Sequence, residues 1–341
     1  MEKIDVIIPV YKPGEKFKKL ITLLEQQTHP IHRIILINTE KKYFDSFFYA
    51  TGFLEQYKNI LVRHISKYEF DHAGTRRMAV ELSDADFFVC MTDDAMPMDE
   101  YLIENLLAYH KVEGVAVSYA RQCVPKKSAE IEKFSRNFNY PKESRIKSAE
   151  DLPELGIKTY FCSDVCAMYR RSIYDELGGF VKQAIFNEDM MFAAKAIEHQ
   201  YKIAYAADAK VRHYHKYTNM QQLKRNFDNG ASQAMHPEIF EKVPATAEGK
   251  RMVQATKEYL KKKGKSRMIP SLYITSGFKY IGFTLGKHYK KLPKWFVQKC
   301  SASPLYFQKH NGDEVHIDPA YGYGRSKVEK EWAKNSARKN K

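Results

Sequence analysis

Residues 4–14 read Ile4-Asp5-Val6-Ile7-Ile8-Pro9-Val10-Tyr11-Lys12-Pro13-Gly14, an apolar run that ends in a turn signal. An apolar run of this length, closed by proline and glycine, is typical of a β-strand buried on both faces of a parallel sheet. The next residues, 14–27, carry apolar side chains at helical spacing: Phe17, Leu20, Ile21 and Leu24. A buried strand followed by a helix predicts the first unit of an α/β domain.

The alternation of strand and helix continues through the first half of the chain. Strands are predicted over residues 33–37, 60–65, 87–91 and 115–119, and helices over 74–82 and 99–109. Residues 122–158 are polar and rich in lysine and glutamate, so we expect a long excursion or lid there. Further extended segments are predicted at 161–170 and 201–214. This order predicts an open, Rossmann-like parallel sheet with helices around it.

The charge of the chain is concentrated in its last third. The 341 residues have a formal net charge of +15, yet residues 1–217 hold 31 basic and 31 acidic side chains, whereas residues 218–341 hold 25 basic and 10 acidic ones. We therefore divide the chain into an α/β domain, 1–217, and a mainly helical basic region, 218–341, with a membrane-surface or acceptor-binding role. In the alternative interpretation these lysines only solvate helix faces. Helices are predicted within 219–300, and a tail at 301–341 that frays.

Composition and motifs exclude several classes of protein. With 44% hydrophobic and 13% aromatic residues, the chain has the material for a packed core, which excludes wholesale disorder. We expect a cytoplasmic location, because no secretory signal precedes the first strand and no stretch approaches the roughly 18 apolar residues of a membrane span. Five scattered cysteines without zinc-ribbon spacing favour the same reducing compartment. The sequence contains no P-loop, dinucleotide fingerprint or nucleic-acid-binding motif, so we expect no nucleic acid partner.

Polar residues follow three of the predicted strands at the point where each strand ends. They are Tyr11-Lys12-Pro13, Asn38-Thr39-Glu40 and Thr92-Asp93-Asp94. In an open parallel sheet, ligands bind beyond the carboxyl ends of the strands. We therefore expect these three loops, which are far apart in sequence, to line one crevice.

Two of these residues, Asp93 and Asp94, are adjacent carboxylates. Neighbouring carboxylates repel each other and commonly bind a cation, and Mg²⁺ or Mn²⁺ is held by one or two carboxylates together with phosphate oxygens. Because strand side chains alternate between faces, only one of the two carboxylates is expected to point into the crevice. His213 and His215 lie on one face of the last extended segment and are further candidate ligands. The alternative is a solvated aspartate pair that caps the helix near Asp99.

The stretch Asn187-Glu188-Asp189 begins a predicted helix that ends near His199. An aspartate at this position is commonly a helix cap. The Gly178-Gly179-Phe180 turn upstream favours a second interpretation, in which the helix end faces the crevice and a carboxylate takes a proton from an attacking hydroxyl. The segment 70–76, Phe-Asp-His-Ala-Gly-Thr-Arg, places small residues and donors at another helix start, where anions are favoured.

Taken in order, these clusters resemble the family-two inverting glycosyltransferases and, within them, the bacterial rhamnosyltransferases. The segment 70–76 is the one that favours the rhamnosyltransferases, and the resemblance extends over about residues 4–310. The matching pieces are Ile8-Pro9-Val10-Tyr11, Thr92-Asp93-Asp94-Ala95-Met96-Pro97, Gly178-Gly179-Phe180, Glu188-Asp189, His213-Tyr214-His215, 280–286 and Lys291-Leu292-Pro293.

The resemblance implies a GT-A fold for residues 1–217 and a role for each matching residue. Asp94 corresponds to the metal-binding aspartate of the D-x-D-type motif, with Thr92 in place of the first aspartate, and His213 to the second ligand of Mg²⁺ or Mn²⁺. Asp189 corresponds to the catalytic base. Asn38 departs from the usual aspartate, which leaves the nucleobase open. The residues implied around the nucleotide sugar are Pro9, Tyr11, Asn38, Glu40, His72, Gly74, Thr75, Arg76 and Asp93.

The implied reaction is inverting transfer of L-rhamnose from dTDP-β-L-rhamnose to a lipid-linked or polysaccharide acceptor in cell-surface glycan synthesis. Two alternatives remain, namely another donor such as UDP-galactose or UDP-glucose, or a non-catalytic protein that binds a polyanion or membrane. A helical projection of residues 274–294 adds an expectation of peripheral contact with the inner face of the cell membrane. It places Ile274, Phe278, Ile281, Leu285 and Leu292 on one face and Lys279, Lys287, Lys290, Lys291 and Lys294 on the other. The alternative is that this apolar face packs on the α/β domain.

Overall fold

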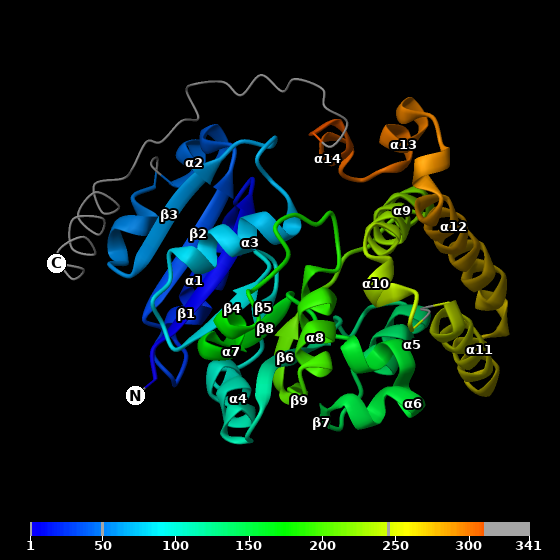
Figure 1. Cartoon of the computed structure of the whole chain (residues 1–341), viewed down its shortest axis with the longest axis horizontal. Helices are drawn as coiled ribbons and strands as arrows, with labels where there is room; N and C mark the ends of the chain where they lie inside the picture. The colour runs from blue at the N-terminus through cyan, green and yellow to red at the C-terminus, as the bar shows by residue number, and fades with distance from the viewer. Residues whose placement is uncertain (1, 49–50, 244–245, 310–341) are drawn as a thin grey trace.

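A nine-stranded mixed sheet with helices on both faces forms one part of the computed structural model, and a group of C-terminal helices lies beside it (Figure 1). The structure describes residues 2–48, 51–243 and 246–309. The strands follow the order β3-β2-β1-β4-β8-β6-β9-β5, and β7 pairs with β9. Their bounds are β1 Ile4–Tyr11, β2 Arg33–Thr39, β3 Ile60–Ile65, β4 Phe87–Met91, β5 Met96–Pro97, β6 Val115–Cys123, β7 Arg145–Lys147, β8 Cys166–Arg170 and β9 Lys202–Arg212.

The first four long strands are parallel, as predicted, but the sheet as a whole is not. Strand β8 runs antiparallel to both β4 and β6, and β5 and β7 run antiparallel to β9. The predicted parallel order is thus observed in β1 to β4, within a sheet that is mixed as a whole. The antiparallel direction of β8 follows from the long excursion after β6, from which the chain returns to the middle of the sheet. The extended segment predicted from residue 161 begins as a strand only at Cys166.

Both faces of β1 are buried, as its apolar run predicted. Ile7 packs into a core with helices α3 (His72–Glu81), α7 (Arg171–Glu176) and α8 (Glu188–Glu198), whereas Val6 and Ile8 pack into a second core on the other face. The second core receives the predicted apolar side chains of α1 (Glu15–Glu25), together with α2 (Lys41–Phe48) and α4 (Leu102–Ala108). The excursion after β6 folds into α5 (Glu130–Asn139), β7 and α6 (Leu152–Leu155), and β7 joins it to β9.

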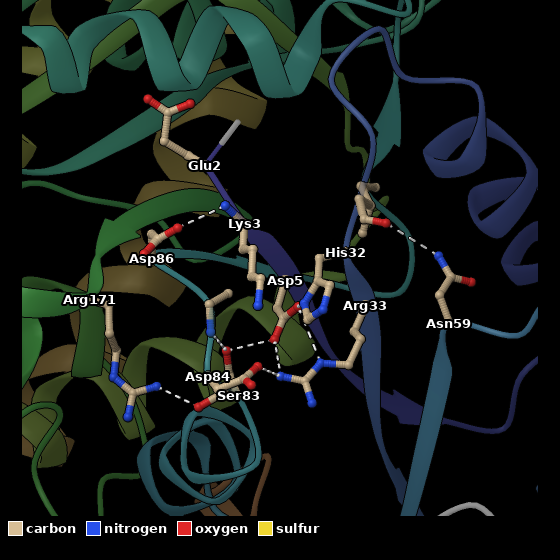
Figure 2. Close-up of polar contacts among 12 residues, drawn as sticks. Glu2, Lys3, Asp5, His32, Arg33, Asn59, Ser83, Asp84, Asp86 and Arg171 are labelled. Carbon is tan, nitrogen blue, oxygen red and sulfur yellow. Dashed lines mark hydrogen bonds and ion pairs between the residues drawn. The ribbon is translucent and has the colours of Figure 1, made fainter. Parts of the chain in front are cut away.

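An ionic cluster around the buried Asp5 carboxylate lies at the amino end of β1, the end opposite to the predicted crevice (Figure 2). The Asp5 carboxylate accepts hydrogen bonds from Arg33, His32 and the Ser83 hydroxyl. Asp5, His32 and Asp84 are close enough to hold a cation, but the Arg33 guanidinium already pairs with both carboxylates. We therefore assign this cluster to the packing of β1 against β2 and β4 and not to a metal site.

The predicted helical region after residue 218 is observed within the described residues. Its helices are α9 (Asn219–Met235), α10 (Pro237–Phe240), α11 (Thr246–Lys262), α12 (Ile269–Lys287), α13 (Lys294–Cys300) and α14 (Pro304–Lys309). The single helix projected over 274–294 was wrong, since α12 ends at Lys287 and Pro293 starts the next helix. Most of the predicted tail, 310–341, lies outside the described residues.

Glycines allow α12 to approach α9 closely. A Cβ atom on Gly282 would lie 2.2 Å from the backbone oxygen of Leu223, and one on Gly286 would lie 2.0 Å from that of Phe227. Both distances are shorter than any van der Waals contact, so only glycine fits at these positions. Helix α9 is thereby held between α12 and the α/β domain.

Candidate active site

Three residues with left-handed backbone occupy the loops in which the sequence predicted ligand binding. Lys12 follows β1, Glu40 follows β2 and Asn187 precedes α8, with φ angles of 54°, 67° and 64°. Such angles are uncommon outside glycine and cost free energy, and they concentrate where the surrounding structure holds a functional loop in place. These three positions lie in the loops of the candidate site, and a fourth such residue, Gln200, follows the other end of α8.

The loops after β1 and β4 meet, as predicted. The Tyr11 backbone amide lies 3.4 Å from Asp93 Oδ2, which it faces as a donor. Burial raises the pKa of the Asp93 carboxyl, and the charge of Asp94 raises it further, to about 6. The neighbouring carboxylate turns away from Tyr11 toward two histidines, so the pair diverges in the way that strand alternation predicts.

An open aromatic pair lies at the end of β1. The Tyr11 ring is 40% exposed and meets the Tyr43 ring edge-on at a centroid distance of 5.8 Å. The ammonium groups of Lys12 and Lys67 both lie 5.3 Å from the centre of the Tyr11 ring. Burial favours the neutral phenol, but the interaction with Lys67 outweighs it and lowers the pKa of Tyr11. A flat ring flanked by two cations can stack a nucleobase and attract phosphate.

Asn38 is buried at the end of β2 with half of its amide unused. Its Nδ2 lies 3.0 Å from His64 Nδ1, whereas its Oδ1 has no hydrogen-bond partner among the described residues. Glu40 Oε1 accepts a hydrogen bond of 2.9 Å from the Lys67 amide and so ties the end of β2 to the loop after β3. Pro9 lies half-buried within β1. The unpaired Asn38 oxygen is a free acceptor for a donor group on a base.

Asp94, His213 and His215 form a compact group of potential metal ligands. One carboxylate oxygen of Asp94 lies 2.8 Å from His215 Nε2 and the other 3.4 Å from His213 Nε2. Burial would raise the pKa of Asp94, but the hydrogen bond from His215 and both imidazoles lower it to about 2. The group thus offers a carboxylate and two ring nitrogens, one ligand atom from each residue, all within 4.8 Å of one another.

The tautomer of His213 makes this group suitable for a cation. Burial lowers the pKa of His213 to about 4, so the ring is neutral near pH 7. Its Nδ1 lies 3.0 Å from Gln122 Oε1, the amide oxygen that also accepts from Arg136. An amide oxygen only accepts, so Nδ1 carries the proton and the Nε2 lone pair faces Asp94. Two acceptors that face each other need a cation between them, and Mg²⁺ or Mn²⁺ fits this donor set.

Asp189 lies in the first turn of α8, partly buried. Its Oδ2 accepts a hydrogen bond of 3.1 Å from the Asp164 backbone amide, and Oδ1 accepts one from Met190. Burial raises the pKa of Asp189 well above its usual range, and the charges of Glu188 and Asp164 add to this effect. A carboxylate with a raised pKa is a stronger base, which suits proton abstraction near neutral pH.

Hydrogen bonds connect Asp189 to the histidine group. Gln122 Nε2 donates to the Ser163 hydroxyl at 2.9 Å, and the residue after Ser163 is Asp164, whose amide binds Asp189. Gln122 is also the partner of His213. The structure therefore brings the predicted metal ligands and the predicted base into one continuous network.

Arg76 is engaged in ion pairs instead of facing an open crevice. Its guanidinium lies 3.0 Å from Asp164 and 2.9 Å from Glu188, and it is almost fully buried. Arg76 thus pairs with Asp164, whose backbone amide binds Asp189, and with Glu188, which precedes Asp189 in the chain. A buried guanidinium with two carboxylate partners fixes the positions of both neighbours.

The rest of segment 70–76 also packs inward. Asp71 caps α3 by accepting from the Gly74 amide at 2.7 Å, and a Cβ atom on Gly74 would lie 2.6 Å from this carboxylate. Burial lowers the pKa of His72, whose ring packs against Phe186. The Thr75 hydroxyl is buried and has no hydrogen-bond partner within the described ranges. The segment therefore anchors α3, and Thr75 retains an unused polar atom.

Helix α9 holds the loop that presents Asp189. The Asn187 amide donates to Asn229 Oδ1 at 2.9 Å, and the Ser232 hydroxyl donates to the Phe186 carbonyl. Ile185 is buried with side chains of the C-terminal helices. The basic C-terminal region thus supports the candidate base, a link that the division at residue 217 did not foresee.

Sequence reasoning missed Gln122, and it named His215 as a candidate ligand although the resemblance implied only His213. Gln122 was placed in the excursion, because the predicted strand ended at residue 119, whereas β6 continues to Cys123 through pairing with β9. If the strand had been predicted to continue to Cys123, Gln122 would have been recognised as a polar residue near the end of a strand, where ligands bind. His215 was noted on the same face as His213, and it is the imidazole closer to Asp94.

Comparison with known proteins extends these observations. The family described as glycosyl transferase family 2 matches residues 5–178. The O-antigen chain rhamnosyltransferase RfbN of Salmonella typhimurium is 38% identical over 306 residues, which cover 89% of this chain and 95% of that protein. The O-antigen chain rhamnosyltransferase WbaN of Salmonella anatum is 36% identical over 309 residues, covering 90% and 95%.

A solved structure shares the fold at low sequence identity. The mannosyltransferase PcManGT from Pyrobaculum calidifontis, in complex with GDP-Man and Mn²⁺, superposes with a TM-score of 0.53 at 11% identity. The match covers 98% of this chain and 84% of that one. At this identity the likeness concerns the fold alone.

Proposed function

Because this chain belongs to glycosyl transferase family 2 and has the GT-A type of fold, we propose that it transfers L-rhamnose from dTDP-β-L-rhamnose to a cell-surface glycan. The observation that supports this proposal best is the network that joins Asp94, His213 and Asp189. The proposed donor follows the names of the two relatives, which are rhamnosyltransferases of O-antigen chains.

At the donor end, the residues at the strand ends bind and orient the nucleotide. The Tyr11 ring stacks the base, and the unpaired Asn38 oxygen accepts a hydrogen bond from it. Asp94, His213 and His215 hold Mg²⁺ or Mn²⁺, which when bound neutralises charge on the diphosphate. Gln122 keeps the His213 ring in the tautomer that presents Nε2.

At the acceptor end, Asp189 removes the proton from the attacking hydroxyl, whose oxygen bonds to the anomeric carbon from the face opposite the diphosphate. The bond from the anomeric carbon to the diphosphate breaks in the same step, so the nucleoside diphosphate leaves with the bonding electrons and the anomeric configuration is inverted. Asn187 and Met190, on either side of Asp189 along the chain, line a cavity of about 360 Å³. The rings of Tyr119, Phe161 and Tyr205 form part of its wall. An apolar wall with polar groups around it suits a sugar ring, so we place the acceptor glycan in this aromatic cavity.

A panel of nucleotide sugars tests the proposed donor. With Mn²⁺ present, dTDP-β-L-rhamnose should raise the unfolding midpoint, because a donor at 100 times its Kd adds about 2.7 kcal/mol to the free energy of unfolding. The same donor should be hydrolysed slowly in the absence of an acceptor. Faster turnover of UDP-galactose or UDP-glucose would reassign the donor. Absence of turnover with every nucleotide sugar would contradict the proposed function.

We also propose that the C-terminal helices dock on the cytoplasmic surface of a membrane. In the described ranges, no helix combines the length and apolar character needed to cross a bilayer. Residues 259–309, however, contain twelve lysine and arginine residues and neither aspartate nor glutamate. Exposed apolar residues occur in the same stretch: Tyr273, Ile274, Tyr280, Ile281 and Trp295.

The orientation of α12 supports surface docking. At about 100° per residue, Tyr273, Ile274, Tyr280 and Ile281 lie on the side opposite Gly282 and Gly286, which face α9. Ile274 and Ile281 are 55% and 51% exposed, so they do not pack on the α/β domain. Aromatic and apolar side chains flanked by lysines are typical of helices that lie in a bilayer interface.

Sedimentation with liposomes tests this docking. Binding should rise with the anionic lipid fraction, fall with salt, and weaken when Lys287, Lys290, Lys291 and Lys294 become glutamine, because each lysine adds about 1 kcal/mol near an anionic surface. The matched control changes the exposed Lys16, Lys19, Lys58 and Lys111 of the α/β domain to glutamine, which alters net charge equally. Equal loss in both variants would contradict a specific face.

A further inference from the structure

Arg225, on α9, is held by two aromatic rings and by no carboxylate. Its Cζ atom lies 4.7 Å from the centre of the Tyr217 ring and 5.5 Å from that of the Phe186 ring. Among the described residues, its guanidinium forms no ion pair and no hydrogen bond. A cation–π contact uses the charge of a guanidinium and leaves its N–H groups available as donors.

The carboxylates of neighbouring segments are already occupied. Asp228, one turn further along α9, accepts a hydrogen bond of 2.6 Å from the Ser301 hydroxyl. Glu188, which begins α8, pairs with Arg76 at 2.9 Å. The positive charge of Arg225 is therefore left for an anionic ligand to balance.

The two rings place Arg225 between the loop of the candidate base and the segment of the histidines. Phe186 belongs to the loop before α8, whose first turn carries Asp189. On the other side, the Tyr217 ring stacks on His215 with 5.1 Å between the ring centroids. A donor that has its diphosphate at the histidines and its anomeric carbon at the base must extend across this region.

The charge of Arg225 also reaches the proposed donor site. Burial lowers the pKa of His213, and the charge of Arg225 acts in the same direction. Burial likewise lowers the pKa of His72, and Arg225 again adds to the effect. A cation that disfavours a second positive charge on these rings favours negative charge in the same place.

We propose that Arg225 is a further catalytic residue, whose N–H groups donate hydrogen bonds to the diphosphate of the donor. When the bond between the anomeric carbon and the diphosphate oxygen breaks, its electron pair stays with that oxygen, and the guanidinium stabilises the charge that develops there. The inference rests on the proposed function, because it adds a residue to the same reaction. It gives α9, a helix of the basic C-terminal region, a direct role in the chemistry.

Nucleotide binding in excess EDTA tests this role without turnover. Calorimetry should show that Arg225→Gln binds thymidine diphosphate at least about tenfold more weakly than the natural chain, because hydrogen bonds to a charged group are lost. Thymidine monophosphate lacks the phosphate that bonds to the sugar, so its affinity should change much less. The matched control, Arg267→Gln, removes an exposed arginine before α12 and should bind both nucleotides like the natural chain. Equal losses for the two nucleotides, or no preference of the natural chain for the diphosphate, would overturn the proposal.

A second variant covers the case in which Arg225→Gln is unstable, which circular dichroism and the unfolding midpoint reveal. Arg225→Lys keeps a cation at the two rings but lacks the planar fork of donors that matches phosphate oxygens. It should bind the diphosphate more weakly than the natural chain and the monophosphate equally well. Unchanged diphosphate affinity in Arg225→Lys would contradict the proposed hydrogen bonds.

Kinetics separate the role of Arg225 from that of Asp189. In Arg225→Gln, kcat should fall by about 10²–10³-fold, the usual cost of losing a donor to charge that develops in a transition state. The rise of kcat with pH that depends on Asp189 should persist. Loss of that rise with unchanged diphosphate affinity would assign Arg225 to support of the base loop and overturn the proposal.

The same binding series with uridine and guanosine nucleotides distinguishes the two levels of inference. If another base binds best, the donor is wrong, but the preference for the diphosphate and its loss in Arg225→Gln should remain. Turnover of nucleotide sugars by the natural chain tests the proposed function separately from this residue.

Discussion

Replacing Asp189 with asparagine is expected to lower kcat by roughly 10²–10⁴-fold, because the acceptor hydroxyl then loses its base. Asparagine has nearly the same size and still accepts one of the two backbone hydrogen bonds that Asp189 receives from Asp164 and Met190, so the fold and donor binding are expected to persist. Steady-state kinetics with donor and acceptor, together with a donor Kd from calorimetry, measure the two quantities separately.

The pH profile adds an independent readout for the same residue. Burial and the neighbouring carboxylates raise the pKa of Asp189 well above the roughly 3.9 of an ordinary aspartate. A base works only when deprotonated, so kcat should rise with pH through this raised pKa, and Asp189→Asn should lose that limb. The control is Asp208→Asn, an exposed aspartate on β9. Full activity of Asp189→Asn would remove this residue from the mechanism.

The second large effect is expected at the cation site. Asp94→Ala removes the only carboxylate of the group formed with His213 and His215. We expect kcat/KM to fall by at least about 100-fold, since loss of a residue that only supports a metal ligand already costs 10–100-fold. Donor affinity should fall with it, because a cation held by this group would offset the charge of the diphosphate.

Metal titration provides the measurement and its control. Activity of the natural chain should disappear in excess EDTA and return with Mn²⁺ or Mg²⁺, whereas Asp94→Ala should require more metal or show no recovery. Glu100→Ala removes a nearby exposed carboxylate and should behave like the natural chain. Activity that survives excess chelator would show that the reaction does not use this group as a metal site.

Local sequence determined most of the elements and the order of the polar clusters. The apolar run 4–10 predicted β1, and the spacing of Phe17, Leu20, Ile21 and Leu24 predicted the buried face of α1. These features are set by side-chain burial along a short segment, so a periodicity of two or 3.6 residues is enough to reveal them. The family also followed from the order of short motifs, and the comparisons confirm it.

Tertiary contacts decided what those motifs do in the folded chain. Arg76 belongs to a segment that the resemblance places around the nucleotide sugar, and in the folded chain it forms ion pairs with Asp164 and Glu188, which come from distant segments. Likewise, the tautomer of His213 depends on Gln122, which lies 91 residues away and reaches the site only because β6 pairs beyond its predicted end. Ion pairs and hydrogen bonds form between atoms that folding brings together, and their partners leave no periodic signal in the sequence. The sequence by itself determined the sheet, the helices and the candidate residues, whereas the direction of β8, the burial of Arg76 and the partners of Asp189 were decided by packing between distant segments.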